Sequence, residues 1–475
     1  MADVDAAPVS TPPGGLDLTS GPITRTLIAF MIPTLGSSIL QSLNGSINAI
    51  WVGRLLGEEA LAATSNAHTI MFLMLAFVFG FGMASTILIG QAVGRRDIDD
   101  ARRVMGTAFT AFAAVSILLS AIGYVFAPDI LHLLATPPSV EPLALAYLRV
   151  IFIGLPAALM LTMLMMALRG GGDSMTPLWF MLLSVVLDSG LNPLFIAGIG
   201  PFPEMGIAGS AVATLIANYV ALLGLIVTIY WRDLTLRLRG AELRFLLPDP
   251  KILRTIVAKG LPIGLQMIAV SVSAMTMFGL VNREGVATAA AFGVALQLWT
   301  YVQMPAMAVG AAVSTMVAQN IGANRWDRVR QVNRSGIGIV LVITAAMVAL
   351  LAVSDHVVLA LFLGSDSPAM PIARHIQMIG TWSYLLFGVM MVLFGTMRAN
   401  GAVVAPLVIL VIGLLPIRLG FAWLMQPVLG ADALWLSLPI ASISNLVLAV
   451  AYYRSGGWKL ARMGRDETPE PLPVS

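Results

Sequence analysis

Asp188 stands out in this sequence because it is an acidic residue in the middle of a long apolar stretch. Ser184, Asp188 and Asn192 are spaced at i, i+4 and i+8, so a helix presents all three on one face. A charge at the centre of a bilayer costs at least about 2.5–3.5 kcal/mol, which makes such a residue a functional candidate. Burial without a cationic partner favours the protonated carboxyl. Asp188 could therefore take up and release protons, or supply oxygens to Na⁺.

Two further polar stripes accompany this acid. Helical spacing aligns Ser37, Gln41, Asn44 and Asn48 in one apolar stretch, and Ser210, Thr214 and Asn218 in another. We expect ion coupling by Asp188, Asn192, Asn48 and Thr214. We expect a polar cavity lined by Gln41, Asn44, Ser184 and Asn218. The alternative is that these groups only join helices by hydrogen bonds.

The composition excludes a soluble enzyme and a nucleic-acid binder. Of 475 residues, 58% are hydrophobic and 11% are charged, whereas soluble proteins carry about 25% charged residues. There is no cysteine, and no zinc-protease, nucleophile-elbow or Walker motif occurs. We expect no enzyme activity, no cofactor and no metal beyond Na⁺ at Asp188.

Apolar stretches of about 20 residues predict membrane-spanning helices. The sequence predicts twelve, near 24–52, 61–90, 104–127, 143–168, 175–199, 206–230, 254–281, 287–318, 333–362, 372–397, 403–427 and 432–453. The predicted fold is an all-α integral membrane protein. Arg418 is the other charged residue near the middle of a predicted span, where it could snorkel, pair with a helix C-terminus or meet an anionic group.

The distribution of Lys and Arg predicts the orientation, because positively charged loops stay in the cytoplasm. Most of them lie in alternate connections and in the C-terminal segment, and Arg25 follows the N-terminal segment. We therefore expect both termini in the cytoplasm, with disordered tails at 1–23 and 454–475 and a basic linker at 231–253.

The chain repeats itself. Residues 54–63 resemble 282–291, residues 90–102 resemble 318–330, and LRGGGDSMTP at 168–177 resembles the segment ending at Pro406. These blocks predict two parallel six-helix lobes, 24–230 and 254–453, with the substrate site between them. Pro33 and Pro262 occupy matching places and are expected to kink helices.

The segments WVGRLLGEEALAA, GQAVGRRDIDDARR, LRGGGDSMTP and GIAGSAVAT together resemble the multidrug and toxic compound extrusion (MATE) family. The resemblance implies twelve-helix antiporters with two lobes, which expel organic, often cationic, compounds in exchange for H⁺ or Na⁺. The acid in the first lobe resembles the DinF-like branch. That branch has Asp where this chain has Asn48, and Asn-x-x-x-Asp-Pro where this chain has Asp188, Asn192 and Pro193.

The sequence thus predicts a secondary active exporter that works by alternating access. A lipid-linked precursor or polysaccharide flippase of related architecture is the alternative, and a membrane-embedded enzyme such as a lipid transferase is a third hypothesis. The expected partners are small organic cations and the lipid bilayer of a bacterial inner membrane. The expected oligomeric state is a monomer.

Overall fold

The computed structural model describes residues 15–133, 136–364 and 367–463, without the side chains at 58, 62, 65–73, 75–77 and 133. The segments 1–14 and 464–475, which belong to the expected tails, lie outside the described residues.

The first half of the described chain folds into seven helices, of which α4 is a short one. They are α1 (Ile23–Leu56), α2 (Glu58–Gly94), α3 (Ile98–Val125), α4 (Ala127–Leu133), α5 (Glu141–Gly170), α6 (Met175–Ala197) and α7 (Ile207–Trp231).

The second half contains more interruptions. It comprises α8 (Pro250–Asn282), α9 (Val286–Gly322), α10 (Trp326–Val353), α11 (Asp355–Leu363), α12 (Ala369–Gly380), α13 (Ser383–Ala399), α14 (Val404–Ile412), the π-helical segment η2 (Gly413–Leu419), α15 (Gly420–Leu429) and α16 (Asp432–Ser455). There are also two short 3₁₀ helices among the described residues. The first, η1 (Gly240–Leu246), precedes α8, and the second, η3 (Gly457–Lys459), follows α16.

Within the described residues, ten helices are long and apolar enough to cross a membrane, counting α14 to α15 as one, and the pair α12 and α13, bent by 44°, makes an eleventh. Helix α2 contributes a further apolar segment, Val78–Gly94. Each of the twelve predicted spans overlaps one of these helices or helix pairs. The prediction of an all-α, multi-pass membrane protein is confirmed.

Three predicted spans are less regular than the sequence suggested. The stretch predicted at 333–362 is divided, because α10 ends at Val353 and α11 begins at Asp355. The stretch at 372–397 is bent between α12 and α13. The stretch at 403–427 becomes π-helical around Pro416, whose ring nitrogen cannot donate a helical hydrogen bond.

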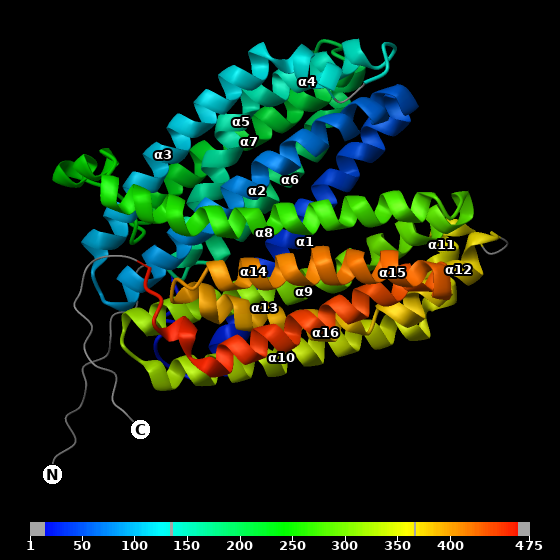
Figure 1. Ribbon diagram of the computed structural model, residues 1–475. Coiled ribbons are helices and arrows are strands. Elements are labelled where there is room, and N and C mark those ends of the chain that lie inside the picture. Colours follow the sequence, from blue (N-terminus) through cyan, green and yellow to red (C-terminus); the bar gives the residue numbers. More distant parts are fainter. Residues whose placement is uncertain (1–14, 134–135, 365–366, 464–475) are drawn as a thin grey trace.

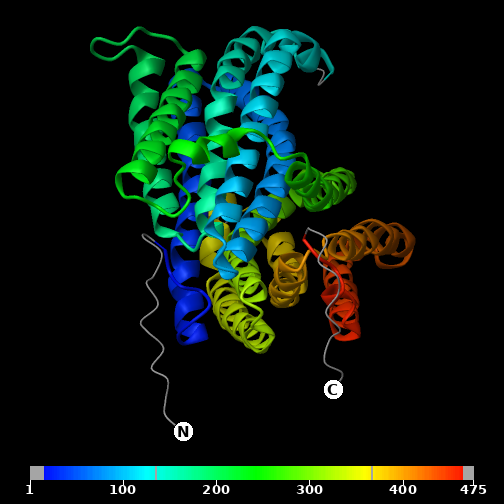
Figure 2. The same cartoon turned by 90° about the vertical axis from the view of Figure 1, so that its left-hand side faces the viewer.

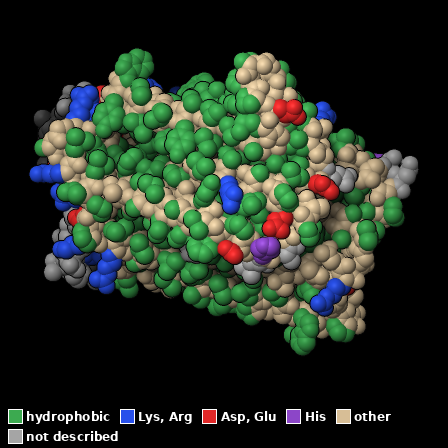
Figure 3. All heavy atoms as spheres, turned by 90° about the horizontal axis from the view of Figure 1, so that it is seen from above, with side chains coloured by type: hydrophobic (Ala, Val, Ile, Leu, Met, Phe, Trp, Pro, Cys, Tyr) green, Lys and Arg blue, Asp and Glu red, His purple; other side chains and the backbone are tan. Residues whose placement is uncertain are grey.

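The two halves form two groups of helices. In Figure 1 the groups lie together at the left and diverge toward the right. Figure 2 shows most of the first-half group above the second-half group, with one end of α1 reaching down beside α9 and α10. The surface of the helices is largely hydrophobic, whereas Lys and Arg gather mainly at the left-hand end (Figure 3). Exposed residues such as Val227 and Val342 fit a lipid-facing surface.

Matching backbone conformations recur in the two halves. Gly57, between α1 and α2, has φ 85°, and Gly285, between α8 and α9, has φ 110°. Gly172 and Gly401, which follow α5 and α13, have φ 94° and 93°. Glycine adopts this left-handed region without the strain of a Cβ. The repeat therefore extends to the tight turns that connect its helices.

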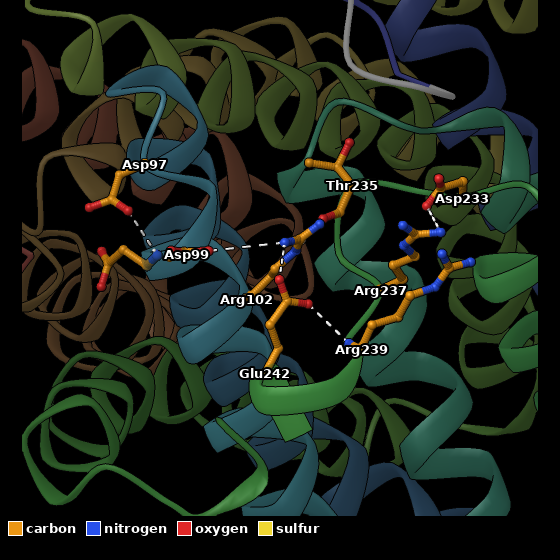
Figure 4. A network of polar contacts seen from close by, with 9 residues as sticks. Asp97, Asp99, Arg102, Asp233, Thr235, Arg237, Arg239 and Glu242 are labelled. Atoms are coloured by element: carbon orange, nitrogen blue, oxygen red, sulfur yellow. Dashed lines mark hydrogen bonds and ion pairs between the residues drawn. The ribbon is translucent and has the colours of Figure 1, made fainter. Parts of the chain in front are cut away.

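The segment between α7 and α8 is folded against α3 (Figure 4). Arg102 of α3 donates from Nη1 to Glu242 Oε1 at 2.6 Å and from Nε to the Thr235 carbonyl at 3.0 Å. The hydroxyl of Thr110 donates to the Leu246 carbonyl at 2.7 Å. These bonds attach the basic linker to the first half before the chain enters α8.

Candidate ion-coupling site

Asp188 lies on α6, which packs against both α1 and α7. Its side chain is only 1% exposed. Three neutral donors from these helices contact the carboxylate: Asn44 Nδ2 at 2.8 Å from Oδ2, and Asn192 Nδ2 and Thr214 Oγ1, each at 3.0 Å from Oδ1. The polar stripes predicted on the three helices therefore converge on the one mid-span acid of this half.

Asn48 belongs to the same network through Thr214. Its Nδ2 donates to Thr214 Oγ1 at 3.5 Å, while its Oδ1 accepts from Ser210 Oγ at 2.8 Å. The hydroxyl of the buried Tyr147, on α5, interacts with Asn48 and lies within electrostatic range of Asp188. Four helices thus hold this polar cluster.

The four residues assigned to a cavity fall in three different places. Asn44 contacts Asp188 directly. Ser184 donates to Asn218 Oδ1 at 3.3 Å, forming a separate pair one helical turn before the acid. Gln41 is exposed and makes no hydrogen bond within the described part of the chain.

Sequence reasoning did not assign Ser210 and Tyr147 to the site. The spacing of Ser210 with Thr214 and Asn218 placed it on the correct face, so the signal was present. No pattern marked Tyr147, because an isolated tyrosine in an apolar helix is compatible with simple packing.

The carboxylate has no cationic neighbour among the described ion pairs. Beside it, Asn192 Oδ1 is buried without a hydrogen-bond partner. Buried acceptors are normally satisfied. This free oxygen fits either the donor of a protonated Asp188 or a small cation bound between oxygens.

Pro33 and Pro262 lie inside the continuous helices α1 and α8. Each removes one helical hydrogen bond, and the Pro33 carbonyl accepts from the Ser37 hydroxyl at 2.9 Å. Their expected role as kinks stays a prediction.

A pair of glutamines joins the two halves at the end where the described chain begins and ends. Gln91 of α2 donates from Nε2 to the Ala399 carbonyl at 2.7 Å, and Gln319 of α9 donates to the Gly170 carbonyl at 3.0 Å. These residues are equivalent in the internal repeat, so the two bonds are reciprocal. A Cβ on Gly94 or Gly322 would lie 2.0 Å from the carbonyl oxygen of Gln319 or Gln91, respectively.

The N-terminal segment reinforces this contact. Leu18 is fully buried, and its carbonyl accepts from Asn320 Nδ2 at 3.0 Å, while the Leu16 amide donates to the Gly172 carbonyl at 3.1 Å. Where we expected a disordered tail over 1–23, residues 15–22 contact both halves, because Leu18 is apolar enough to be buried there.

Asp17 organises the turn that follows. Burial opposes its ionisation, but hydrogen bonds from Thr19 and Ser20 and the charge of Arg325 outweigh burial, and the pKa of Asp17 lies below its usual value. Arg325 also donates to the Thr19 carbonyl at 2.6 Å. The negative charge of Asp17 in the N-terminal segment and the positive charge of Arg325 in the second half therefore hold the segment in place.

Comparison with known proteins identifies relatives along almost the whole chain. A probable multidrug resistance protein, YoeA of Bacillus subtilis (strain 168), is 36% identical over 93% of this chain and 96% of its own. Another from the same organism, YpnP, is 30% identical over 94% and 98%. An FAD transporter of Shewanella oneidensis is 26% identical over 92% and 95%.

Solved structures share the fold. A multidrug resistance MATE family transporter in its outward-facing conformation matches with a TM-score of 0.85 at 21% identity, over 93% of this chain and 97% of that one. A MATE structure in the bent conformation matches with a TM-score of 0.84 at 22% identity, over 92% of this chain and 96% of that one.

The family model named MatE matches this chain twice, at residues 33–194 and 262–424. The two matches follow the internal repeat deduced from the sequence. With the relatives above, they show that the chain belongs to the MatE family of membrane transporters and is not an enzyme.

Proposed function

We propose that this transporter is a secondary active exporter, which expels organic, often cationic, compounds in exchange for H⁺ or Na⁺ at Asp188. The observation that carries the proposal is a mid-span carboxylate, 1% exposed, whose three hydrogen-bond donors are all uncharged. Such a site can alternate between a charged and a neutral state at moderate cost, because no fixed cation holds it in one state.

Ion binding would use the oxygens around the acid. Asp188, Thr214 and the unpartnered Asn192 Oδ1 are the nearest, and Asn48 would join them by releasing Ser210. A proton would instead sit on Asp188 and be shared with Asn192. Placement of the acid in the first half supports assignment to the DinF-like branch.

Alternating access would proceed by rocking of the lobes 24–230 and 254–453, with 231–253 as the linker. Among the described residues, every side-chain hydrogen bond between 15–230 and 254–453 lies at the end that carries Gln91 and Gln319. This distribution supports an outward-open state closed on the cytoplasmic side. The basic residues at the same end support cytoplasmic termini in a bacterial inner membrane.

The relatives' names as multidrug resistance proteins support organic substrates. Gln41 and Asn218 remain available to contact them, since Gln41 is exposed and Asn218 is bonded only through Ser184. We propose that the protein acts as a monomer, because each chain contains both lobes.

The test is the variant Asp188→Asn in proteoliposomes, with uptake of a fluorescent organic cation driven by a pH gradient or a Na⁺ gradient imposed separately. We expect the parent protein to respond to one gradient and the variant to lose that response. Asp129→Asn makes the same chemical change at an exposed position of α4 and should behave like the parent.

Unchanged gradient-driven transport by a folded Asp188→Asn variant would refute the coupling role. The folded state is checked by size-exclusion chromatography, since transport alone cannot separate an inactive protein from an unfolded one.

A further inference from the structure

Arg418 is a buried cation that the ion-coupling site does not use. It lies near the middle of the span Val404–Leu429, is 8% exposed, and has no hydrogen bond or ion pair to another described residue. The described acidic residues of the second half, Glu284, Asp327, Asp355 and Asp432, lie at helix ends. A guanidinium stays charged in proteins, so its burial without a partner is costly.

The local structure around Arg418 contains other polar groups. Gly413 and Arg418 are five residues apart in the π-helical segment η2, and a π turn places them one above the other. The Asn445 side chain of α16 fills the space where Gly413 lacks a Cβ, and its Oδ1 is buried without a partner. The hydroxyl of Tyr384, on α13, lies within electrostatic range of Arg418.

The position of Arg418 matches that of the coupling site in the other half. In the repeat that pairs Pro177 with Pro406, Arg418 corresponds to Ser189, the residue next to Asp188. The equivalent spans α6 and α14–α15 therefore carry an acid and a base at the same depth. No ion pair joins the two among the described residues.

We propose that Arg418, with Asn445 and Tyr384, binds the anionic group, a carboxylate or phosphate, of the transported organic solute. The planar guanidinium matches both groups with two parallel hydrogen bonds. The mid-span depth of Arg418 favours a solute over a phospholipid, whose headgroup lies at the membrane surface. The proposal rests on the proposed export function and narrows its substrates to solutes that carry an anionic group, zwitterions included.

The experiment compares a cationic xanthene dye that bears a free carboxylate with its methyl ester. Affinity is measured first, in detergent, by quenching of tryptophan fluorescence, and transport is then measured in proteoliposomes. We expect Arg418→Met to lower the affinity for the carboxylate dye about tenfold or more relative to the parent. Its affinity for the ester should stay within about twofold of the parent's. Arg418→Lys keeps the positive charge but loses the planar guanidinium that makes two parallel hydrogen bonds. Its affinity for the carboxylate dye should lie between those of the parent and of Arg418→Met.

Arg283→Met, an exposed arginine of the same half, is the matched control and should bind both dyes like the parent. If a folded Arg418→Met protein loses the same affinity for both dyes, or loses affinity for neither, the proposal is overturned. Competition by added phosphatidylglycerol would overturn it in favour of a lipid site. Binding needs no gradient, so a parent that binds the carboxylate dye through Arg418 but does not transport it would refute only the export function.

Discussion

The two oxygens of Asp188 have different surroundings. Oδ2 accepts from Asn44 of α1, whereas Oδ1 accepts from Asn192 on its own helix and Thr214 on α7. A proton or cation on one oxygen therefore changes the contact of α6 with one particular neighbour. The residue proposed to bind the ion also joins α6 to α1 and α7.

Thr214 makes the most connected of these contacts, since it donates to Asp188 and accepts from Asn48. We expect Thr214→Val to lower the free energy of unfolding by about 1–2 kcal/mol, because it removes a hydroxyl bonded to a carboxylate and leaves Asn48 Nδ2 without its acceptor. Thermal unfolding of the purified protein measures the change.

Ser184→Ala provides the control for this variant, because its hydroxyl bonds Asn218 and does not contact the acid. It should cost about 0.6 kcal/mol, the average for hydrogen bonds between membrane helices. Equal losses in both variants would mean that the carboxylate adds nothing to the contact of Thr214.

The central residues of the site could be predicted from the sequence, because a polar side chain inside a bilayer must be placed on a protected helical face. Spacing placed Asp188 and Asn192 on one helical face, but it assigned Asn48 to the acid and Asn44 to the cavity, whereas Asn44 is the residue of α1 that contacts Asp188. Spacing cannot say how helices rotate against each other, which is why Gln41 is exposed although it shares a stripe with Asn44. Tyr147 could not be predicted, since its role depends on packing of α5 against its neighbours.

The ends of α2 and α9 form a reciprocal contact that closes one end of the molecule. Gln91 and Gln319 each reach a carbonyl in the opposite half, and Gly94 and Gly322 allow the backbones to approach. Both glutamines are conspicuous in the repeated blocks of the sequence. Their interaction across the halves could not be deduced, because the repeat says which residues are equivalent and not which ones touch.

We expect Gln91→Leu and Gln319→Leu each to weaken this closed end by about 1 kcal/mol, the net value of a typical hydrogen bond. The double variant should weaken the closed end by about the sum of the two single effects, since the two hydrogen bonds use different partners. Because the chain has no cysteine, a pair of introduced cysteines on the two halves can carry spin labels without background. Distance distributions should shift toward larger separations at this end.

Gln297→Leu is the control, because this exposed glutamine of α9 bonds only Tyr301 of the same helix. It should leave the distances unchanged. A double variant with the parent's distance distribution would show that the glutamines do not hold the halves together.

Helix positions could be predicted almost throughout, whereas breaks within helices were missed. In the stretch 333–362, the polar residues Ser354, Asp355 and His356 mark the point where α10 ends, but the prediction of one span ran through them. Hydropathy does not indicate the π-helical segment at Gly413–Leu419, although Pro416 marks a lost helical hydrogen bond. Such breaks depend on what each helix meets in the folded protein.

At the scale of the whole molecule, two similar halves differ in the sign of their buried charge. Matching glycines with positive φ show that the connections after α1 and α8, and after α5 and α13, have like conformations. The first half nevertheless holds Asp188 and the second holds Arg418. Under the two proposals above, Asp188 takes the coupling ion and Arg418 takes the anionic group of the solute, so this difference would set how much net charge a transport cycle moves.

A zwitterionic dye without net charge, exchanged for one H⁺ or Na⁺ at Asp188, would carry one positive charge inward per cycle. A membrane potential of about 100 mV then supplies about 2.3 kcal/mol, enough for a roughly 50-fold accumulation ratio. The methyl ester is a monocation, and its one-for-one exchange is electrically neutral. A potassium diffusion potential with valinomycin, without pH or Na⁺ gradients, should therefore drive the carboxylate dye and not the ester. Asp188→Asn should abolish the response, and an equal response of both dyes would contradict this division of charge between the halves.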